Sequence, residues 1–323
     1  MDPDRVPRLP AWLGRLLRSK ESSILLALVA IVVLISAVSP NFLRPGNLTM
    51  VARQVAFTAI AALGVFFVIL TGGIDLSIGS LVSLGGIACG FALAGGVPWP
   101  LAAAAGLLTG ALVGAVNGAI VAYLGVTSFI VTLGMLWMAR GAVLVLTEGE
   151  PVKRIPASFI VRAGGDYLGI PAVVWVLAAL AVLAHVLVTR TVYGRRVLAV
   201  GGNEEATELS GINVRRVKFF TYVLSGLYAA VTGILYVARF QTAQPEADKN
   251  IVLDAIAATV IGGTSLFGGE GSVPGVLIGA MIMGAIRSGL VQMKVSPYWQ
   301  DLIIGAIIIL AAVIDVIRRR RAR

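Results

Sequence analysis

The fold is decided by residues 54–95, which read QVAFTAIAALGVFFVILT (54–71), GGID (72–75) and LSIGSLVSLGGIACGFALAG (76–95). A transmembrane helix needs about 20 consecutive, mostly apolar residues, so each flanking run is long enough to cross a bilayer. The residues between the runs include two glycines, which let the backbone turn at little steric cost, and an acid. The stretch therefore predicts two consecutive membrane helices separated by a short break.

The whole chain has the composition of an integral membrane protein. Of its 323 residues, 58% are hydrophobic and only 13% are charged, and its mean hydropathy is +0.93. Soluble domains carry about 25% charged residues, so about half of the charge that solvates a protein surface is missing. We therefore predict an all-α, polytopic bundle of about ten transmembrane helices, over residues 24–38, 54–71, 76–95, 99–123, 127–147, 171–189, 217–238, 251–267, 273–292 and 300–317.

Basic residues flank the apolar runs in three patches, at residues 5–20, 190–218 and 318–323. Lys and Arg are enriched in the cytoplasmic segments of membrane proteins. An even number of spans lies between successive patches, so all three are expected on one side, with both termini in the cytoplasm. We interpret the net charge of +10 as topogenic rather than as a nucleic-acid surface. The predicted organisation is a basic N-terminal segment (1–23), a transmembrane domain (24–317) with a cytoplasmic loop (190–216), and a basic tail (318–323).

Several function classes are disfavoured by the residue types present. Cys89 and His185 are the single residues of their types, so we predict no intrachain disulfide, no metal site and no cofactor. The glycine-rich stretch 261–275 lacks the Gly-Lys-Ser/Thr of a phosphate-binding loop. We interpret it as a tight turn between two membrane helices. The chain is not expected to be an enzyme, because its residues offer no catalytic constellation.

The break near residue 75 contains Asp75 and Ser77, for which two roles are open. One role is to cap the N-terminus of the following helix, where a carboxylate also suits the helix dipole. The other is to lie beside a solute path, since ionisable groups near membrane spans are costly and often functional. A second polar segment, Thr127, Ser128 and Phe129, is either a constriction that opens and shuts or, in the case of Phe129, ordinary packing.

The loop 190–216 has the sequence signals of a short helix. Gly201-Gly202 predicts a turn, Asn203 predicts an N-cap, and the acids that follow suit a first helical turn. Gly211 suits a left-handed C-terminal cap. The predicted helix, at about residues 204–210, is either a docking surface on the cytoplasmic face or part of a solvated loop.

Four charged residues lie in or near the apolar runs: Arg140, Asp254, Arg287 and Asp301. The two acids lie near span ends, from which we expect them to reach the membrane interface. Both arginines lie deeper and are expected to face protein or water, but the sequence identifies no acid partner for either. A dense set of buried carboxylates is not evident, which disfavours a proton-driven carrier.

Several segments in the same order resemble the permeases of bacterial carbohydrate ABC importers, in the ribose-type branch of the binding-protein-dependent permeases. The resemblance covers about residues 40–315. It rests on Ser39-Pro40-Asn41-Phe42, on residues 73–80, on residues 201–212, on Leu253-Asp254-Ala255-Ile256-Ala257-Ala258 and on Gly262-Gly263-Thr264-Ser265.

The resemblance implies that the chain moves a sugar, such as a ribose-like pentose or a related carbohydrate, across the bacterial inner membrane by alternating access. The implied partners are cytoplasmic ABC ATPase subunits, a periplasmic or lipoprotein sugar-binding protein, and a second permease copy or a sister permease. ATP hydrolysis is then expected on a separate chain. By position, the resemblance implies a cytoplasmic gate at Thr127, Ser128 and Phe129, and an ATPase-coupling helix formed by Asn203, Glu204, Glu205, Ala206, Thr207, Glu208, Leu209 and Ser210. The alternative is a stand-alone secondary carrier or channel for a small hydrophilic solute.

Overall fold

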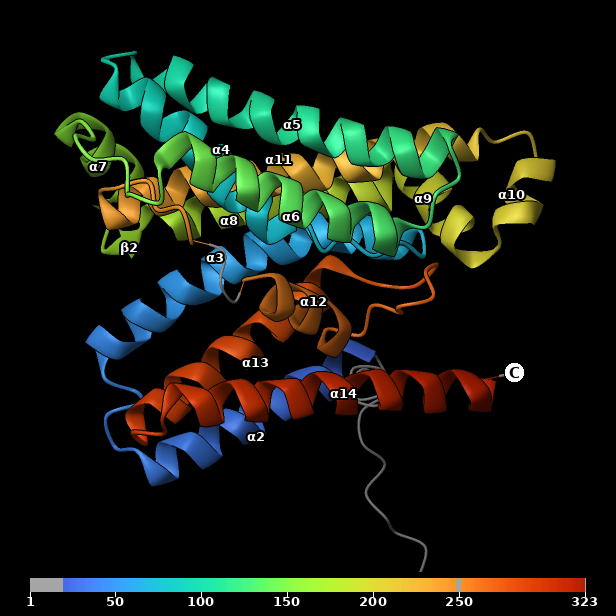
Figure 1. Ribbon diagram of the computed structural model, residues 1–323. Coiled ribbons are helices and arrows are strands. Elements are labelled where there is room, and N and C mark those ends of the chain that lie inside the picture. Colours follow the sequence, from blue (N-terminus) through green and yellow to red (C-terminus); the bar gives the residue numbers. More distant parts are fainter. Residues whose placement is uncertain (1–19, 248–250, 323) are drawn as a thin grey trace, which may run out of the picture.

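The computed structural model describes residues 20–247 and 251–322, which form a bundle of helices with one short hairpin (Figure 1). The predicted cytoplasmic position of residues 1–19 and of Arg323 lies outside the described residues. In chain order the elements are α2 (Lys20–Val38), α3 (Pro45–Leu70), α4 (Ile78–Ala94), α5 (Trp99–Tyr123), α6 (Ser128–Thr147), α7 (Ala157–Gly164), β1 (Asp166–Tyr167), β2 (Ile170–Pro171), α8 (Ala172–Arg190), α9 (Val192–Gly202), α10 (Glu204–Leu209), α11 (Val214–Phe240), α12 (Ile251–Ile261), α13 (Val273–Gln292) and α14 (Pro297–Ala322).

Each of the ten predicted apolar runs corresponds to one of these helices. Seven of the described helices are long and apolar enough to cross a membrane, namely α2, α3, α5, α6, α8, α11 and α13. The apolar parts of α4, α12 and α14 are shorter, so the count of ten spans stays a prediction. The predicted run 251–267 is wrong at its end: α12 stops at Ile261, because Gly263 takes a left-handed φ of +84° that a helix cannot contain.

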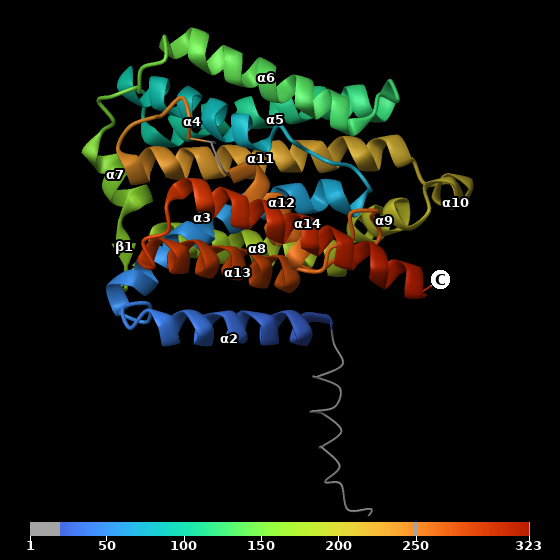
Figure 2. The same ribbon diagram turned by 60° about the horizontal axis from the view of Figure 1, so that its bottom comes forward.

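The two ends of the bundle hold different elements. Figures 1 and 2 both show α10 and the last turns of α14 at one end, which we call the inner end, and α7 with the hairpin at the opposite, outer end. The loop with α10 and the end of α14 thus share an end, as the positions of the basic patches predicted. The start of α2 also lies at the inner end, where Glu21 accepts a hydrogen bond of 3.1 Å from Ser272 at the start of α13.

The centre of the bundle is α3, in which every residue from Val55 to Leu70 is buried. α11 packs against α3, α4 and α5. Its contact with α5 depends on glycines: a Cβ added to Gly110 would lie 2.3 Å from the carbonyl oxygen of Gly226, and one added to Gly114 would lie 2.4 Å from that of Tyr222. Small residues four positions apart are typical where membrane helices pack backbone to backbone.

Candidate functional site

The break between α3 and α4 lies at the inner end and requires both of its glycines. Gly72 has a φ of +77°, in the left-handed region that L side chains rarely adopt. Gly73 has no room for a side chain, because an added Cβ would lie 2.7 Å from the hydroxyl oxygen of Tyr222 on α11. The predicted turn at this glycine pair is therefore confirmed, and Tyr222 explains why the second glycine is needed.

Asp75 is the centre of a buried hydrogen-bond network that joins this break to two other helices. Its Oδ1 accepts from the backbone N–H of Ser77 at 2.9 Å and from the hydroxyl of Ser77 at 2.6 Å. Its Oδ2 accepts from the hydroxyl of Ser225, on α11, at 2.7 Å. Asn117, on α5, donates to the Ser77 hydroxyl at 2.9 Å. Asp75 is only 1% exposed, so its carboxylate holds α4, α5 and α11 together in the interior.

The network bears on the two roles considered for these residues. The bond from the Ser77 N–H to Asp75 satisfies a backbone donor at the start of α4, as a capping bond would. The side chain of Ser77 makes no capping bond to α4, so the capping role proposed for it is wrong. Its hydroxyl instead serves the carboxylate of Asp75.

The segment 127–129 begins α6 and is attached to the same break. The backbone N–H of Ile74 donates to the hydroxyl of Ser128 at 3.2 Å, and the hydroxyl of Thr132 donates to the carbonyl of Ile74 at 3.2 Å. Phe129 is 48% exposed, so packing within this chain does not account for its ring. The inner end of α6 therefore moves with the break or separates from it by losing these two bonds.

The predicted short helix is present as α10. The side chain of Asn203 accepts from the backbone N–H of Ala206 at 2.9 Å, which confirms the predicted N-cap. Gly211 has a φ of +80° and its N–H donates to the carbonyl of Glu208 at 2.9 Å, as the left-handed cap requires. Helix α10 ends at Leu209, so Ser210 follows it. Gly201-Gly202 does not form the predicted turn, because these residues are the last two of helix α9.

Helix α10 is fixed to the bundle on one side and open on the other. Glu204 forms a 2.6 Å ion pair with Lys218 in the first turns of α11. Thr207 is buried and donates to the carbonyl of Asn203 at 2.7 Å. Leu209 is 84% exposed at the end of the helix, beside the exposed Glu205 and Glu208. The open face of α10 thus combines one large apolar side chain with acids.

Three glycine pairs that are far apart in sequence meet beside the break. We call Gly72, Gly201, Gly268 and Gly269 the glycine junction. The N–H of Gly269 donates to the carbonyl of Leu70, the last residue of α3, at 3.0 Å. A Cβ added to Gly201 would lie 1.8 Å from that same carbonyl oxygen, and one added to Gly268 would lie 2.7 Å from the backbone nitrogen of Gly72. Sequence reasoning treated each pair separately and missed their contact.

A cavity of about 680 Å³ lies between the start of α6 and α10. It brings together Thr127 and Ser128 with Asn203, Glu204 and Glu208, while Asp75, Ser77 and Phe129 are not among its lining residues. The break, α11 and the loop before α13 complete its wall, through Thr71, Gly72, Gly73, Arg215, Lys218, Tyr222 and Phe267. The lining carries both acids and bases, so the cavity is polar. Residues that the sequence assigned to two separate functions thus face one space.

Two intramembrane arginines have acid partners that the sequence did not identify. Arg287 on α13 binds Asp254 on α12 through two bonds of 2.7 Å each. Both side chains are nearly buried, so the expectation that Asp254 reaches the membrane interface is wrong. The reason is that a bidentate arginine neutralises the acid inside the bundle. Arg140 on α6 lies 3.5 Å from Glu246, in the loop between α11 and α12.

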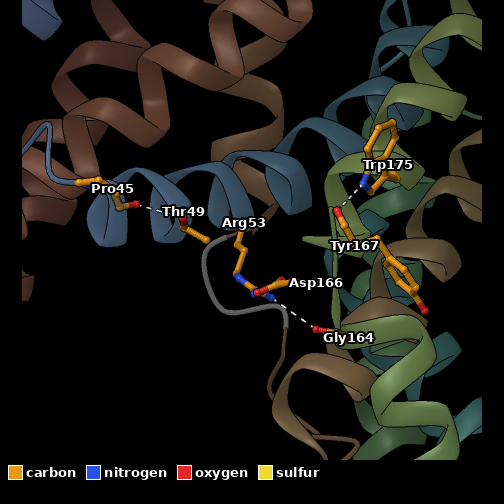
Figure 3. Close-up of polar contacts among 7 residues, drawn as sticks. All are labelled: Pro45, Thr49, Arg53, Gly164, Asp166, Tyr167 and Trp175. Atoms are coloured by element: carbon orange, nitrogen blue, oxygen red, sulfur yellow. Dashed lines mark hydrogen bonds and ion pairs between the residues drawn. The ribbon is translucent and has the colours of Figure 1, made fainter. Parts of the chain in front are cut away.

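The outer end of α3 is attached to the hairpin (Figure 3). Arg53 forms an ion pair with Asp166 and donates to the carbonyl of Gly164 at 3.4 Å. The indole N–H of Trp175 donates to the carbonyl of Tyr167 at 3.3 Å. These contacts fix the hairpin and α7 over the outer end of the bundle.

The structure is thus a bundle of helices, seven of them apolar and long enough to cross a membrane, with a broken span and a cavity at one end. The chain belongs to the family described as branched-chain amino acid transport system / permease component, which matches residues 47–312.

Named relatives agree with this assignment. The ribose import permease protein RbsC of Escherichia coli K12 is 42% identical over 312 residues, which cover 94% of each chain. RbsC of Bacillus subtilis is 40% identical over 90% of this chain and 91% of the relative. The xylose transport system permease protein XylH of Escherichia coli K12 is 36% identical over 87% of each chain. No solved structure matches. The resemblance to ribose-type permeases is thus confirmed.

Replacing Asp75 is expected to destabilise the bundle rather than only to slow transport. Asp75→Ala leaves the donors of Ser77 and Ser225 without their acceptor. Each buried group left unsatisfied lowers the free energy of unfolding by about 1–3 kcal/mol. Thermal denaturation of the purified protein in detergent measures this loss. The control is Glu205→Ala, which removes an exposed carboxylate. Unchanged stability together with lost uptake would instead place Asp75 on the solute path.

The glycine junction predicts opposite results for two neighbouring residues. Gly201→Ala puts a methyl group where the carbonyl of Leu70 lies, whereas an added Cβ on Gly202 meets nothing within 4 Å. We expect Gly201→Ala to lower the yield of monodisperse protein or its uptake activity strongly, and Gly202→Ala to leave both near the parent value. Size-exclusion chromatography and uptake assays measure these effects. Equal behaviour of the two variants would contradict the contact.

Proposed function

We propose that this chain is the membrane-spanning translocation subunit of an ATP-driven importer for a sugar, with a ribose-like pentose as the first candidate. The observation that carries the proposal is the 42% identity to a ribose import permease over 94% of both chains, within a family of permease components. Relatives named for xylose and L-arabinose support a pentose.

Helix α10 is proposed as the contact with separate ATPase chains. A coupling element has to be rigidly attached to the spans and open to a partner. Asn203 and Gly211 cap the two ends of α10, and the Glu204–Lys218 ion pair attaches the helix to α11. The exposed Leu209, with acids beside it, supplies a surface that a groove with an apolar floor and basic rim would fit.

The glycine junction is proposed to carry the movement of α10 to the gate. Because the end of α9 contacts the last carbonyl of α3 through backbone, no flexible side chain lies between them. The break after α3 is in turn bonded to the start of α6 through Ile74 and Ser128. A displacement of α9 and α10 would then pull on Thr127 and Ser128 and change the inner opening of the path, as alternating access requires.

The outer end is proposed as the side that receives solute from a sugar-binding protein. There α7 and the hairpin are fixed to α3 by the contacts of Arg53, so they offer a rigid surface. A second permease chain is proposed to complete the path, either a further copy or a sister subunit. The membrane concerned is the bacterial inner membrane.

Affinity purification of the tagged protein from native membranes in mild detergent tests this function. We expect an ATPase chain and, with it, a sugar-binding protein whose ligand can be identified by thermal-shift screening of pentoses. Recovery of the protein alone, from a preparation in which a control complex survives, together with solute uptake in liposomes without ATP, would overturn the proposal in favour of a stand-alone carrier.

Leu209→Glu is expected to weaken the association with the ATPase by about tenfold or more, which is ~1.4 kcal/mol, because it puts an unpaired charge into the apolar part of the contact. The matched control is Leu168→Glu, since Leu168 is 92% exposed but lies in the hairpin at the outer end. The ratio of ATPase to permease after affinity purification measures the effect. Equal ratios for the two variants would show that α10 is not the contact.

A further inference from the structure

One charged side chain on α6 is in a place that lipid does not tolerate. Arg140 is the only charged residue of this helix, twelve positions from its inner end at Ser128 and seven from its outer end at Thr147. A helix rises 1.5 Å per residue, which places Arg140 about 10 Å from the outer end. Because the Cα–Cβ bond of a helical residue tilts toward the helix N-terminus, the first bond of this side chain points toward the inner end, away from the nearer end of the helix.

The ion pair that Arg140 makes is partly exposed rather than buried in the protein. Its guanidinium lies 3.5 Å from the carboxylate of Glu246, and the two side chains are 39% and 54% exposed. The same guanidinium lies 5.9 Å from the centre of the Trp137 ring, which is itself 64% exposed. Charged side chains at membrane depth face protein or a water-filled space. This side of α6 therefore borders water or another protein surface, not acyl chains.

The opposite side of α6 provides a contrast within the same helix. Trp137 and Arg140 are three residues apart and share a face. Met138 is 69% exposed as well, but lies about 200° around the helix from Arg140 at 100° per residue. Val145, seven positions further along the same side, is 80% exposed. The face of Arg140 also carries the partly exposed Leu133 and Leu144, so the two faces differ by the charge and the indole ring.

We propose that Trp137, Arg140 and Glu246 form a transient contact site for the sugar on the outer half of the solute path, an inference that rests on the proposed function. A sugar ring has an apolar C–H face, which an indole ring can cover, and a rim of hydroxyl groups that both donate and accept hydrogen bonds. Arg140 supplies donors, of which the bond to Glu246 uses one, and Glu246 supplies acceptors.

The loose geometry suits a site that must release its ligand. An N···O separation of 3.5 Å is at the outer limit of a hydrogen bond, so a hydroxyl can replace it at little cost. Both charges remain partly in water, where an ion pair is worth little. The site would bind weakly and orient the sugar between the binding protein and the inner gate.

Cysteine accessibility tests whether this face of α6 is wet. Two variants, Trp137→Cys and Met138→Cys, are made in a Cys89→Ala background. The complex assembled from each variant is reconstituted in proteoliposomes and treated with a charged, membrane-impermeant thiol reagent. We expect Trp137→Cys to react at least about tenfold faster, and ribose with its binding protein to slow that reaction. Equal rates at the two positions, or no reaction at position 137, would overturn the proposal, the latter by showing that protein or lipid covers it.

Uptake measurements test the role of the charge. We expect Arg140→Gln to reduce sugar uptake by about tenfold, in keeping with the loss of hydrogen bonds to a charged group, while ATP hydrolysis stimulated by the loaded binding protein persists. Arg140→Lys should recover part of the uptake, and Met138→Ala should match the parent. A parallel loss of uptake and of stimulated hydrolysis would assign Arg140 to assembly and overturn the site. If the thiol reagent reaches position 137 but the parent complex transports no sugar, the proposed function is wrong, and the assignment of a sugar to this site falls with it.

Discussion

The carboxylate of Asp75 is buried where one span ends and the next begins, and its two oxygens accept hydrogen bonds from Ser77 and Ser225. Backbone that leaves a helix at membrane depth must find its partners inside the protein. The break between α3 and α4 meets this requirement through Asp75, through the bonds of Ile74 to α6, and through the contact of Leu70 with Gly269. Those bonds hold the non-helical segment whose Thr71, Gly72 and Gly73 line the inner cavity.

Much of the architecture follows from local sequence. Apolar runs locate ten of the described helices, and in seven of them the run is long enough to cross a bilayer. The caps of α10 were also predictable, because Asn203 and Gly211 act within a few residues of their own positions. The end of α12 was misplaced because the residues after Ile261 are apolar enough to extend a span. The backbone there is set by glycine conformation, which hydropathy does not report.

The rest depends on contacts between distant segments. The glycine junction joins residues near 72, 201 and 268, and each pair alone is typical of an ordinary turn. Likewise, the pairing of Asp254 with Arg287 could not be chosen from one sequence, in which several acids and bases compete as partners. Of the candidate site, the short helix α10 was predicted, but not the cavity that it shares with Thr127 and Ser128, whose role as a gate stays a prediction. Close approach between backbones and ion pairing between distant residues leave no pattern in the neighbouring sequence from which they could be predicted.

The Asp254–Arg287 pair also constrains how the protein is made. In the part of the chain that the structure describes, α12 has 11 residues and an acid in its first turn, so it is a poor substrate for insertion on its own. Its charge is neutralised by a residue of α13, which emerges from the ribosome later. We expect the two helices to partition from the translocon into the bilayer as one hairpin, with the ion pair formed before either meets lipid.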